Sequence, residues 1–186
     1  MVGCRRGSDL PVLGAAPPFT LTDQTGQPFG SADVKGRVVI ADFIYTRCTD
    51  ACPLLSATMR DLQERLKTEG LFGSQVVLLS FSVDPQYDTP EVLAQYGQRF
   101  HADPAGWRFL TGDVDVVHHL LQDGFKVGAA EPAAGRGNDP GLLHTSRFVL
   151  IDRSGQIRGY PGFDEVFDEV QGETLAQQAR ELAAER

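Results

Sequence analysis

The feature that most constrains the fold is a buried-strand pattern joined through two cysteines to a helix pattern. Residues 38–45 are apolar, β-branched or aromatic apart from one aspartate, as in a strand covered on both faces. Residues 53–66 carry leucines and a methionine at spacings of four, three and four, which predicts one buried stripe of a helix. Cys48 and Cys52 lie between them. Open α/β sheets place their chemistry beyond the carboxyl ends of strands, so this junction is the candidate site.

Pro53 sets the expected start of the helix. Proline is tolerated in the first helical turn, but it disfavours helical dihedrals for the residue before it, here Cys52. We therefore expect residues 46–52 to form a loop and the helix to begin near Pro53. Thiolates at a helix start feel the positive end of its dipole, and Arg47 adds a cation. We expect a lowered pKa for at least one of the two thiols, although nearby aspartates act in the opposite direction.

Two cysteines four residues apart suit a bridging metal better than a disulfide. In a regular helix the Cβ atoms of such a pair lie roughly 5–6 Å apart, whereas a disulfide requires about 3.8 Å. A metal with bonds of about 2.3 Å to each sulfur tolerates the wider gap. A loop could relax to either geometry, so the spacing favours metal binding without excluding a disulfide. Two buried, inert cysteines are the remaining alternative.

A soft-metal site needs a further ligand, and three of the four histidines are poor candidates. His118 and His119 fall in a predicted helix over residues 113–121, where adjacent side chains diverge by about 100° and cannot easily bind one ion. We expect both to be surface residues. His101 follows a predicted helix over residues 90–100 and is expected to be solvated.

His144 is the fourth histidine and has a different setting. It stands directly before a strand pattern at residues 146–152. It also ends a segment rich in glycine, proline and alanine, residues 128–143, and unstructured segments of this length in compact domains are usually functional. His144 is therefore either the missing ligand or an ordinary loop histidine.

Together these motifs resemble the Sco/SenC family of copper-binding, thioredoxin-like proteins that assist cytochrome c oxidase assembly. The resemblance covers about residues 17–165. It rests on four stretches that occur in the same order, namely residues 18–24, 42–53, 82–90 and 144–152. One departure is Thr49, since family members often carry proline directly after the first cysteine.

The resemblance implies that Cys48, Cys52 and His144 are the copper ligands. It also implies that Asp84 influences metal loading or electron transfer to partners. The ligand chemistry agrees, because thiolates select copper(I), zinc or iron–sulfur clusters, and imidazole suits copper and zinc. Two sulfurs and one nitrogen leave a three-coordinate site that suits copper(I), while copper(II) could add a water or a carboxylate. Structural zinc usually requires a fourth ligand.

The remaining pattern is that of an α/β protein. We expect a thioredoxin-like fold with a mixed central sheet, flanking helices and an N-terminal β-hairpin. The hairpin is predicted at residues 19–22 and 27–29, further strands at 75–83, 107–110 and 157–160, and a closing helix at 173–185.

Composition and length limit the domain organisation and the partners. With 186 residues, 41% of them hydrophobic, the chain can build one sizeable core. We divide it into a flexible tether, residues 1–16, and one copper-binding domain, residues 17–186. A net charge of −8 argues against nucleic-acid or anionic-lipid partners.

The N-terminus predicts where the protein works. No apolar stretch has the length of a membrane span, but Gly3-Cys4 resembles the end of a bacterial lipoprotein cleavage site. We therefore expect a periplasmic or other extracytoplasmic protein, tethered through a lipid on Cys4, with an unpaired cysteine in a disordered tail as the alternative. A dithiol that cycles is compatible with that compartment.

Three functions are compatible with this sequence. The first is a copper metallochaperone that delivers copper to the apo copper-site subunit of cytochrome c oxidase, or prepares that site. The second is a thiol–disulfide oxidoreductase in which Cys48 and Cys52 reduce the cysteines of a partner. The third, a peroxidase or redox sensor, is the weakest because no arginine or threonine arrangement marks a peroxidatic cysteine. Another copper chaperone or a thiol reductant would be a further partner.

Overall fold

The computed structural model describes residues 8–49, 51–127, 147–162 and 169–185. Within these residues the fold is an eight-stranded mixed sheet in the order β1-β8-β7-β4-β5-β6-β2-β3. The strands are β1 (Gly14–Ala15), β2 (Thr20–Asp23), β3 (Pro28–Gly30), β4 (Val38–Ile44), β5 (Val76–Ser82), β6 (Trp107–Thr111), β7 (Val149–Ile151) and β8 (Gln156–Gly159). The helices are η1 (Ser31–Val34), α1 (Ala51–Thr68), α2 (Pro90–Arg99), α3 (Val114–His119), η2 (Leu120–Gly124) and α4 (Glu169–Ala184).

The centre of the sheet is formed by β4 and β5. Both strands are buried at every one of their seven residues, and they run parallel with Val38 opposite Val76. β6 continues the parallel arrangement beyond β5, while β7 pairs antiparallel with β4. Strands covered on both faces need apolar residues on both, which explains why the two strands are apolar except at Asp42, Ser80 and Ser82.

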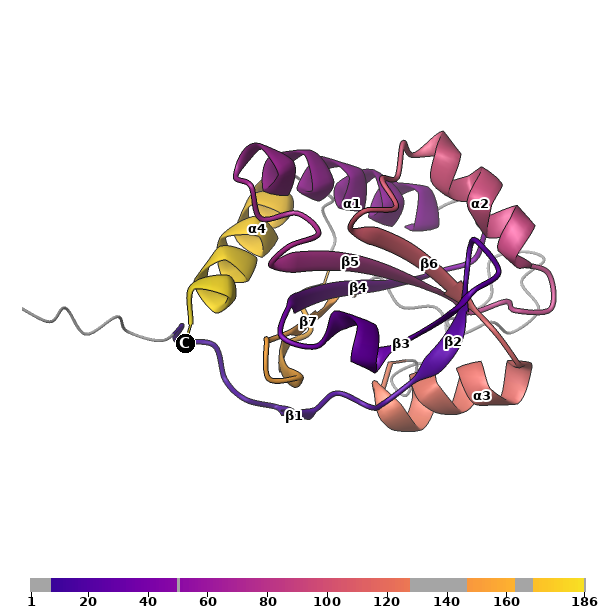
Figure 1. Ribbon diagram of the computed structural model, residues 1–186, viewed down its shortest axis with the longest axis horizontal. Coiled ribbons are helices and arrows are strands. Elements are labelled where there is room, and N and C mark those ends of the chain that lie inside the picture. The colour runs from indigo at the N-terminus through magenta and orange to yellow at the C-terminus, as the bar shows by residue number, and fades with distance from the viewer. Residues whose placement is uncertain (1–7, 50, 128–146, 163–168, 186) are drawn as a thin grey trace, which may run out of the picture.

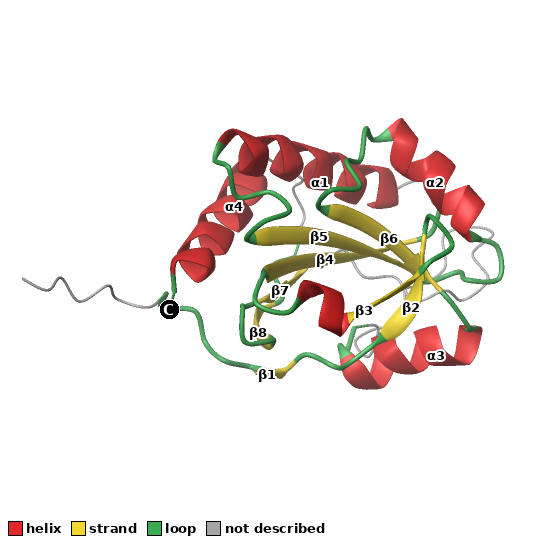
Figure 2. Ribbon diagram, viewed as in Figure 1, coloured by secondary structure: helices red, strands yellow, loops and turns green. Residues whose placement is uncertain are grey.

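Helices cover both faces of the sheet, as Figures 1 and 2 show. α1, α2 and α4 lie over one face, and α3 lies over the other. The side chains of β4 alternate between two cores: Val38, Ile40 and Ile44 pack with α1, whereas Val39 and Phe43 pack on the α3 side. The expected thioredoxin-like, mixed α/β architecture is confirmed.

Several local predictions are also confirmed. β2 and β3 form the expected antiparallel hairpin. The Thr89 side chain accepts a hydrogen bond from Val92 N at the start of α2, directly before Pro90. The Asp113 side chain caps α3 in the same way. These caps satisfy backbone N–H groups that the first helical turn leaves without partners.

Other boundaries differ from the expectation. α1 begins at Ala51 rather than near Pro53, so that Cys52 belongs to the helix and not to the loop. The effect of a proline on the preceding residue is a preference, and here the first turn accommodates it because Pro53 replaces an N–H with no helical partner. β7 is shorter than the predicted 146–152, and the closing helix begins earlier than 173, at Glu169.

Part of the N-terminal segment is held against the domain. The expected flexible tether includes residues 8–16. In the structure, however, β1 pairs with β8, and Ser8 N donates a hydrogen bond to Glu185 Oε1 at 2.7 Å. Residues 1–7, including Cys4, lie outside the described part of the chain, as do residues 128–146 with His144. In the described ranges, no helix has both the length and the apolarity needed to cross a membrane.

Candidate metal centre

The two cysteines lie where β4 passes into α1. A tight turn follows β4, in which Cys48 N donates to Tyr45 O at 3.1 Å. Cys52 N then donates to Cys48 Sγ at 3.4 Å, so the first sulfur accepts a bond from the first turn of the helix. Cys52 is 4% exposed, whereas Cys48 is partly exposed. The fold thus brings two sulfurs together, one shielded and one accessible to a partner.

Burial controls the acidity of the inner thiol. The pKa of the Cys52 thiol is raised above its ordinary value, chiefly by burial and further by the neighbouring Cys48 and Asp42. The expected lowering by the helix start is therefore not met at Cys52, because loss of solvation outweighs the dipole. A thiol of this kind remains protonated until a metal ion or an oxidising partner displaces its proton.

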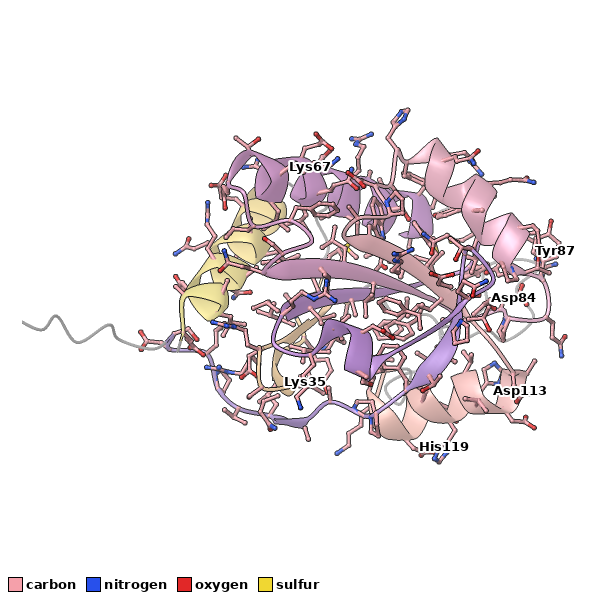
Figure 3. The ribbon with its side chains drawn as sticks, viewed as in Figure 1. Lys35, Lys67, Asp84, Tyr87, Asp113 and His119 are labelled. Atoms are coloured by element: carbon pink, nitrogen blue, oxygen red, sulfur yellow. The ribbon has the colours of Figure 1, made fainter. Side chains whose placement is uncertain are left out.

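Arg47 is neutralised by the loop that follows β5. Its guanidinium lies 2.5 Å from Asp84 Oδ2, and its Cζ atom lies 4.3 Å from the centroid of the Tyr87 ring. Asp84 and Tyr87 occupy the end of the molecule where α2 begins (Figure 3). The expected cation beside the thiols is consequently paired with Asp84. Asp84, predicted as a supporting residue, contacts residues 45–49, the cysteine loop, through Arg47.

Asp88 is a second anchor for the cysteine loop, and its role is not predicted by the sequence pattern. It is fully buried and accepts hydrogen bonds from Thr46 Oγ1 at 2.5 Å and from Ser82 Oγ at 2.6 Å. The backbone N–H of Thr46 also points at its carboxylate, at 3.2 and 3.3 Å. Thr46 stands two residues before Cys48, so Asp88 fixes the backbone that presents the first sulfur. The only sequence signal was an aspartate beside a helix cap, which normally indicates a solvated turn.

Asp42 is the buried aspartate of β4. It lies on the same side of the strand as Ile40 and Ile44, the side of α1 and Cys52. It is fully buried, and neither carboxyl oxygen has a hydrogen-bond partner within the described residues. Burial raises its pKa from 3.8 to about 7, and the neighbouring Ser80 hydroxyl opposes this increase only in part.

The histidines inside the described residues stay away from the thiols. His119 is exposed on α3, with Nδ1 2.7 Å from Asp123 Oδ2 (Figure 3), and His118 is half-buried on the same helix. His101 is exposed after α2. Over the described ranges, no three histidine, cysteine or acidic side chains cluster as metal ligands. The predicted third ligand, His144, belongs to the residues that are not described.

The donor set that is described fits a soft metal ion. Two sulfurs in one turn offer thiolate ligands, which favour copper(I), zinc and iron–sulfur clusters over hard cations. The same pair can also exchange with a disulfide, because the accessible Cys48 can be attacked and Cys52 lies within the same turn. A mixed sheet whose central strand ends at such a pair, directly before a helix, defines a thioredoxin-like protein of dithiol or metal-binding type.

Comparison with known families places the chain within that class. Residues 12–180 match the SCO1/SenC family. This chain belongs to the SCO1/SenC family.

Three solved structures illustrate the likeness. A SCO1/SenC family lipoprotein from Bacillus anthracis is 33% identical, with a TM-score of 0.75 over 91% of this chain and 95% of the other. BsSco, a Sco-family cytochrome c oxidase assembly protein with a disulfide switch, is 27% identical, with a TM-score of 0.76 over 95% and 98%. Copper-bound ScoI from Bradyrhizobium japonicum is 26% identical, with a TM-score of 0.69 over 90% and 99%.

Proposed function

We propose that this protein binds one copper ion through Cys48, Cys52 and His144, and that it delivers copper to cytochrome c oxidase or prepares the copper site of that enzyme. The observation that carries the proposal is the approach of the two sulfurs at the start of α1, where Cys52 N in the first turn donates a hydrogen bond to Cys48 Sγ in the preceding loop. Family membership and the copper-bound ScoI relative support copper as the cargo.

The two sulfurs would have different roles in transfer. Cys52 is almost fully buried and its thiol pKa is raised, so it would hold copper in a site shielded from water. Cys48 is partly exposed and would be the sulfur that an incoming ligand of the partner replaces first. Both thiols must lose their protons on loading, so we expect copper affinity to rise with pH.

Asp84 would act on this site through Arg47. The ion pair between them and the stacking of Arg47 on Tyr87 join the cysteine loop to the β5–α2 loop. Asp84 is thus proposed as a positioning residue. Its own carboxylate is already engaged by the Arg47 guanidinium, which makes direct coordination of copper less favourable.

The proposal is tested by titrating the fully reduced protein with copper(I) and reading the ligands by X-ray absorption. We expect two sulfur neighbours and one nitrogen neighbour for each copper. His144→Ala should remove the nitrogen signal and weaken copper binding by at least tenfold. His101→Ala is the matched control, because the His101 side chain is exposed and its backbone O contacts α1 at Gln63, eleven residues beyond Cys52, and it should change neither quantity.

The rate of disulfide reduction by the same variant distinguishes copper delivery from a function that uses only the two thiols. His144→Ala should leave the rate of disulfide reduction within about twofold of the unchanged protein, because that reaction needs only the two thiols. A wild-type spectrum without a nitrogen neighbour, or equal loss of copper binding and reduction, would contradict the three-ligand site.

The burial asymmetry also favours a second function, reduction of a partner's cysteines. Cys48 as thiolate would attack the disulfide of the partner, forming a mixed disulfide and releasing one partner thiolate. Cys52, after losing its proton, would attack Cys48 Sγ and release the second partner thiolate. The partner gains two electrons, and this protein is left with a Cys48–Cys52 disulfide that an external thiol reductant must reduce before copper can bind.

An extracytoplasmic location is part of the same proposal. The Bacillus anthracis relative is a lipoprotein, and Cys4 follows Gly3 in this chain as it would at a lipidation site. We propose that a lipid on Cys4 tethers the domain to a membrane. The expected observation is a lipid-sized mass increase on Cys4 in native protein, and an unmodified Cys4 would contradict it.

A further inference from the structure

A cavity of about 370 Å³ lies on the face of the sheet opposite the thiols. Its floor is formed by apolar side chains of the α3-side core, including Val39, Leu79, Phe81, Phe125 and Ile151. Cys48 and Cys52 pack in the other core, so the sheet separates the two places. Pockets of roughly 300–1,000 Å³ with apolar walls are typical of small-molecule sites.

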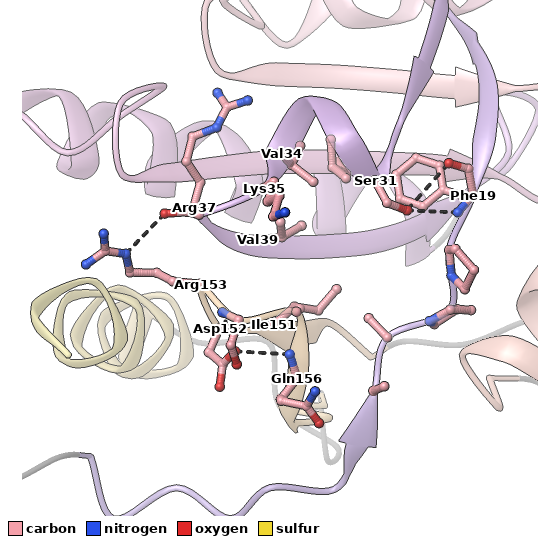
Figure 4. Close-up of a pocket in the computed structure, with 18 of the residues that line it drawn as sticks. Phe19, Ser31, Val34, Lys35, Arg37, Val39, Ile151, Asp152, Arg153 and Gln156 are labelled. Atoms are coloured by element: carbon pink, nitrogen blue, oxygen red, sulfur yellow. Dashed lines mark hydrogen bonds between the residues drawn. The ribbon is translucent and has the colours of Figure 1, made fainter. Parts of the chain in front are cut away.

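The walls come from segments far apart in the sequence. Residues 15–19, η1 and the β7–β8 turn each form one side of the cavity (Figure 4). Pro17 closes one end by close contact with Gly124, where a Cβ atom would lie 2.8 Å from Pro17 Cβ. Residues 15–19 cross this face of the sheet from β1 at one edge to β2 near the other, and the short side chains of residues 15–18 leave the space beneath them open.

The rim of the cavity is positively charged. Lys35 is exposed, lines the cavity, and has no carboxylate partner within the described residues. Arg153 also lines it, and its bonds there go to backbone oxygens, Gly36 O at 3.1 Å and Glu185 O at 3.0 Å. The acidic lining residue Asp152 lies 3.0 Å from Arg158, which it shares with Glu185, and the lining itself holds this one carboxylate against the three cations of Lys35, Arg37 and Arg153. A local excess of positive charge is notable in a chain of net charge −8.

We propose that this cavity binds a single-chain carboxylate amphiphile, that is, a fatty acid of about ten carbons. The apolar floor would take the chain, and Lys35 with Arg153 would hold the single negative charge at the rim. A volume of about 370 Å³ lies at the small end of the range typical of small-molecule sites. This matches a medium-length chain better than a two-chain lipid. The proposal is independent of copper, because no lining residue belongs to the metal centre.

The experiment is a methyl NMR titration of the whole chain with sodium decanoate below its micelle concentration. We expect saturable shifts for the methyl groups of Val39, Leu79 and Ile151, and none for Met59 and Leu62 on the α1 side. Lys35→Glu should weaken decanoate binding about tenfold. Arg60→Glu is the matched control, because it makes the same charge change at an exposed position of α1, and it should stay within twofold.

A neutral ligand of the same chain length distinguishes the contribution of charge to binding from that of apolar contact. 1-Decanol should bind the unchanged protein and Lys35→Glu equally well, and added salt should weaken decanoate binding but not decanol binding. Absence of saturable shifts in the cavity methyl groups would overturn the proposal, for instance because another part of the chain fills the space. Equal effects of Lys35→Glu and Arg60→Glu would also overturn it. Neither outcome would affect the copper proposal.

Discussion

At the scale of single residues, Asp42 has the least favourable environment in the described structure. A fully buried carboxyl group without a hydrogen-bond partner cannot be ionised without a large desolvation cost, and its pKa rises to about 7 in consequence. The charge of Asp42 also raises the pKa of the Cys52 thiol, so the carboxyl group and the thiol disfavour each other's ionised forms. The two groups therefore tend not to be charged at the same time.

This arrangement predicts a specific pH dependence of stability. Between pH 3.8 and about 7 the folded protein keeps the Asp42 proton that the unfolded chain has lost. The stability contribution is therefore fully present below pH 3.8 and is lost as the pH rises toward 7. The loss amounts to about 4 kcal/mol at most, at 1.36 kcal/mol for each pKa unit.

The measurement is urea unfolding of reduced, copper-free protein between pH 4 and pH 8. Asp42→Asn should remove this part of the pH dependence and should be more stable than the unchanged protein at pH 8. Asp61→Asn, at an exposed carboxyl group of α1, is the control and should keep the original pH dependence. Parallel stability curves for Asp42→Asn and the unchanged protein would show that Asp42 does not titrate as inferred.

At the scale of elements, the cysteine loop is held in place by side chains of the β5–α2 segment, which lies beside it. The β5–α2 segment supplies Asp84 for Arg47 and Asp88 for Thr46, and Ser82 at the end of β5 supports Asp88. β4 and β5 are adjacent parallel strands, so both loops leave the sheet at the same edge. Sheet topology therefore places two carboxylates beside the residues that precede Cys48.

Removing one bond of this anchor should loosen the metal site. Thr46→Val keeps the shape of the side chain but removes the hydroxyl that donates to Asp88, leaving a buried carboxylate with one donor fewer. We expect a loss of about 1–3 kcal/mol in the free energy of unfolding and a several-fold weaker affinity for copper(I). Hydrogen exchange at Cys48 N should become faster.

Thr46→Ser is the matched control, because it retains the hydroxyl. It should keep copper affinity and hydrogen exchange close to those of the unchanged protein. If Thr46→Val and Thr46→Ser behave alike, the bond between Thr46 and Asp88 does not position Cys48, and the anchor must reside in Arg47 and Asp84.

At the scale of the whole molecule, the two ends of the described chain meet at Arg158. Its buried guanidinium lies 3.0 Å from both Asp152 Oδ2 and Glu185 Oε2 and donates to Leu10 O at 2.7 Å and to Ser8 Oγ at 3.1 Å. One side chain on β8 thereby joins the N-terminal segment to the end of α4. This segment also forms a wall of the cavity on the α3 side.

Arg158→Met tests this junction. It preserves an apolar stem but leaves Asp152 buried without its cation, and we expect a loss of about 3 kcal/mol in the free energy of unfolding. Residues 8–16 should become accessible to proteases. Arg180→Met removes a more exposed pair with Glu69 and should cost less than about 1 kcal/mol. Equal destabilisation by the two variants would contradict a special role for Arg158.

The sequence predicted the order of the elements well, because hydrophobic period and caps are local. The apolar run of β4, the stripe of α1 and the Asp113 and Thr89 caps each depend on residues within about one turn or strand. α1 begins two residues before the predicted Pro53, because the preference of a residue before proline for non-helical dihedrals is weaker than the first turn of the helix. The sequence could not predict the burial of Asp88 and Cys52, because burial depends on distant segments.

By itself, then, the sequence determined the α/β class, the position of the cysteine pair after a central strand, and the family to which the chain belongs. These follow from patterns of neighbouring residues and from ordered motifs. Only the tertiary structure decided that Arg47 is neutralised by Asp84, that burial raises the pKa of the Cys52 thiol, and that a charged-rim cavity lies behind the sheet. Each of these depends on groups brought together by folding, whose charge and solvation no local pattern records.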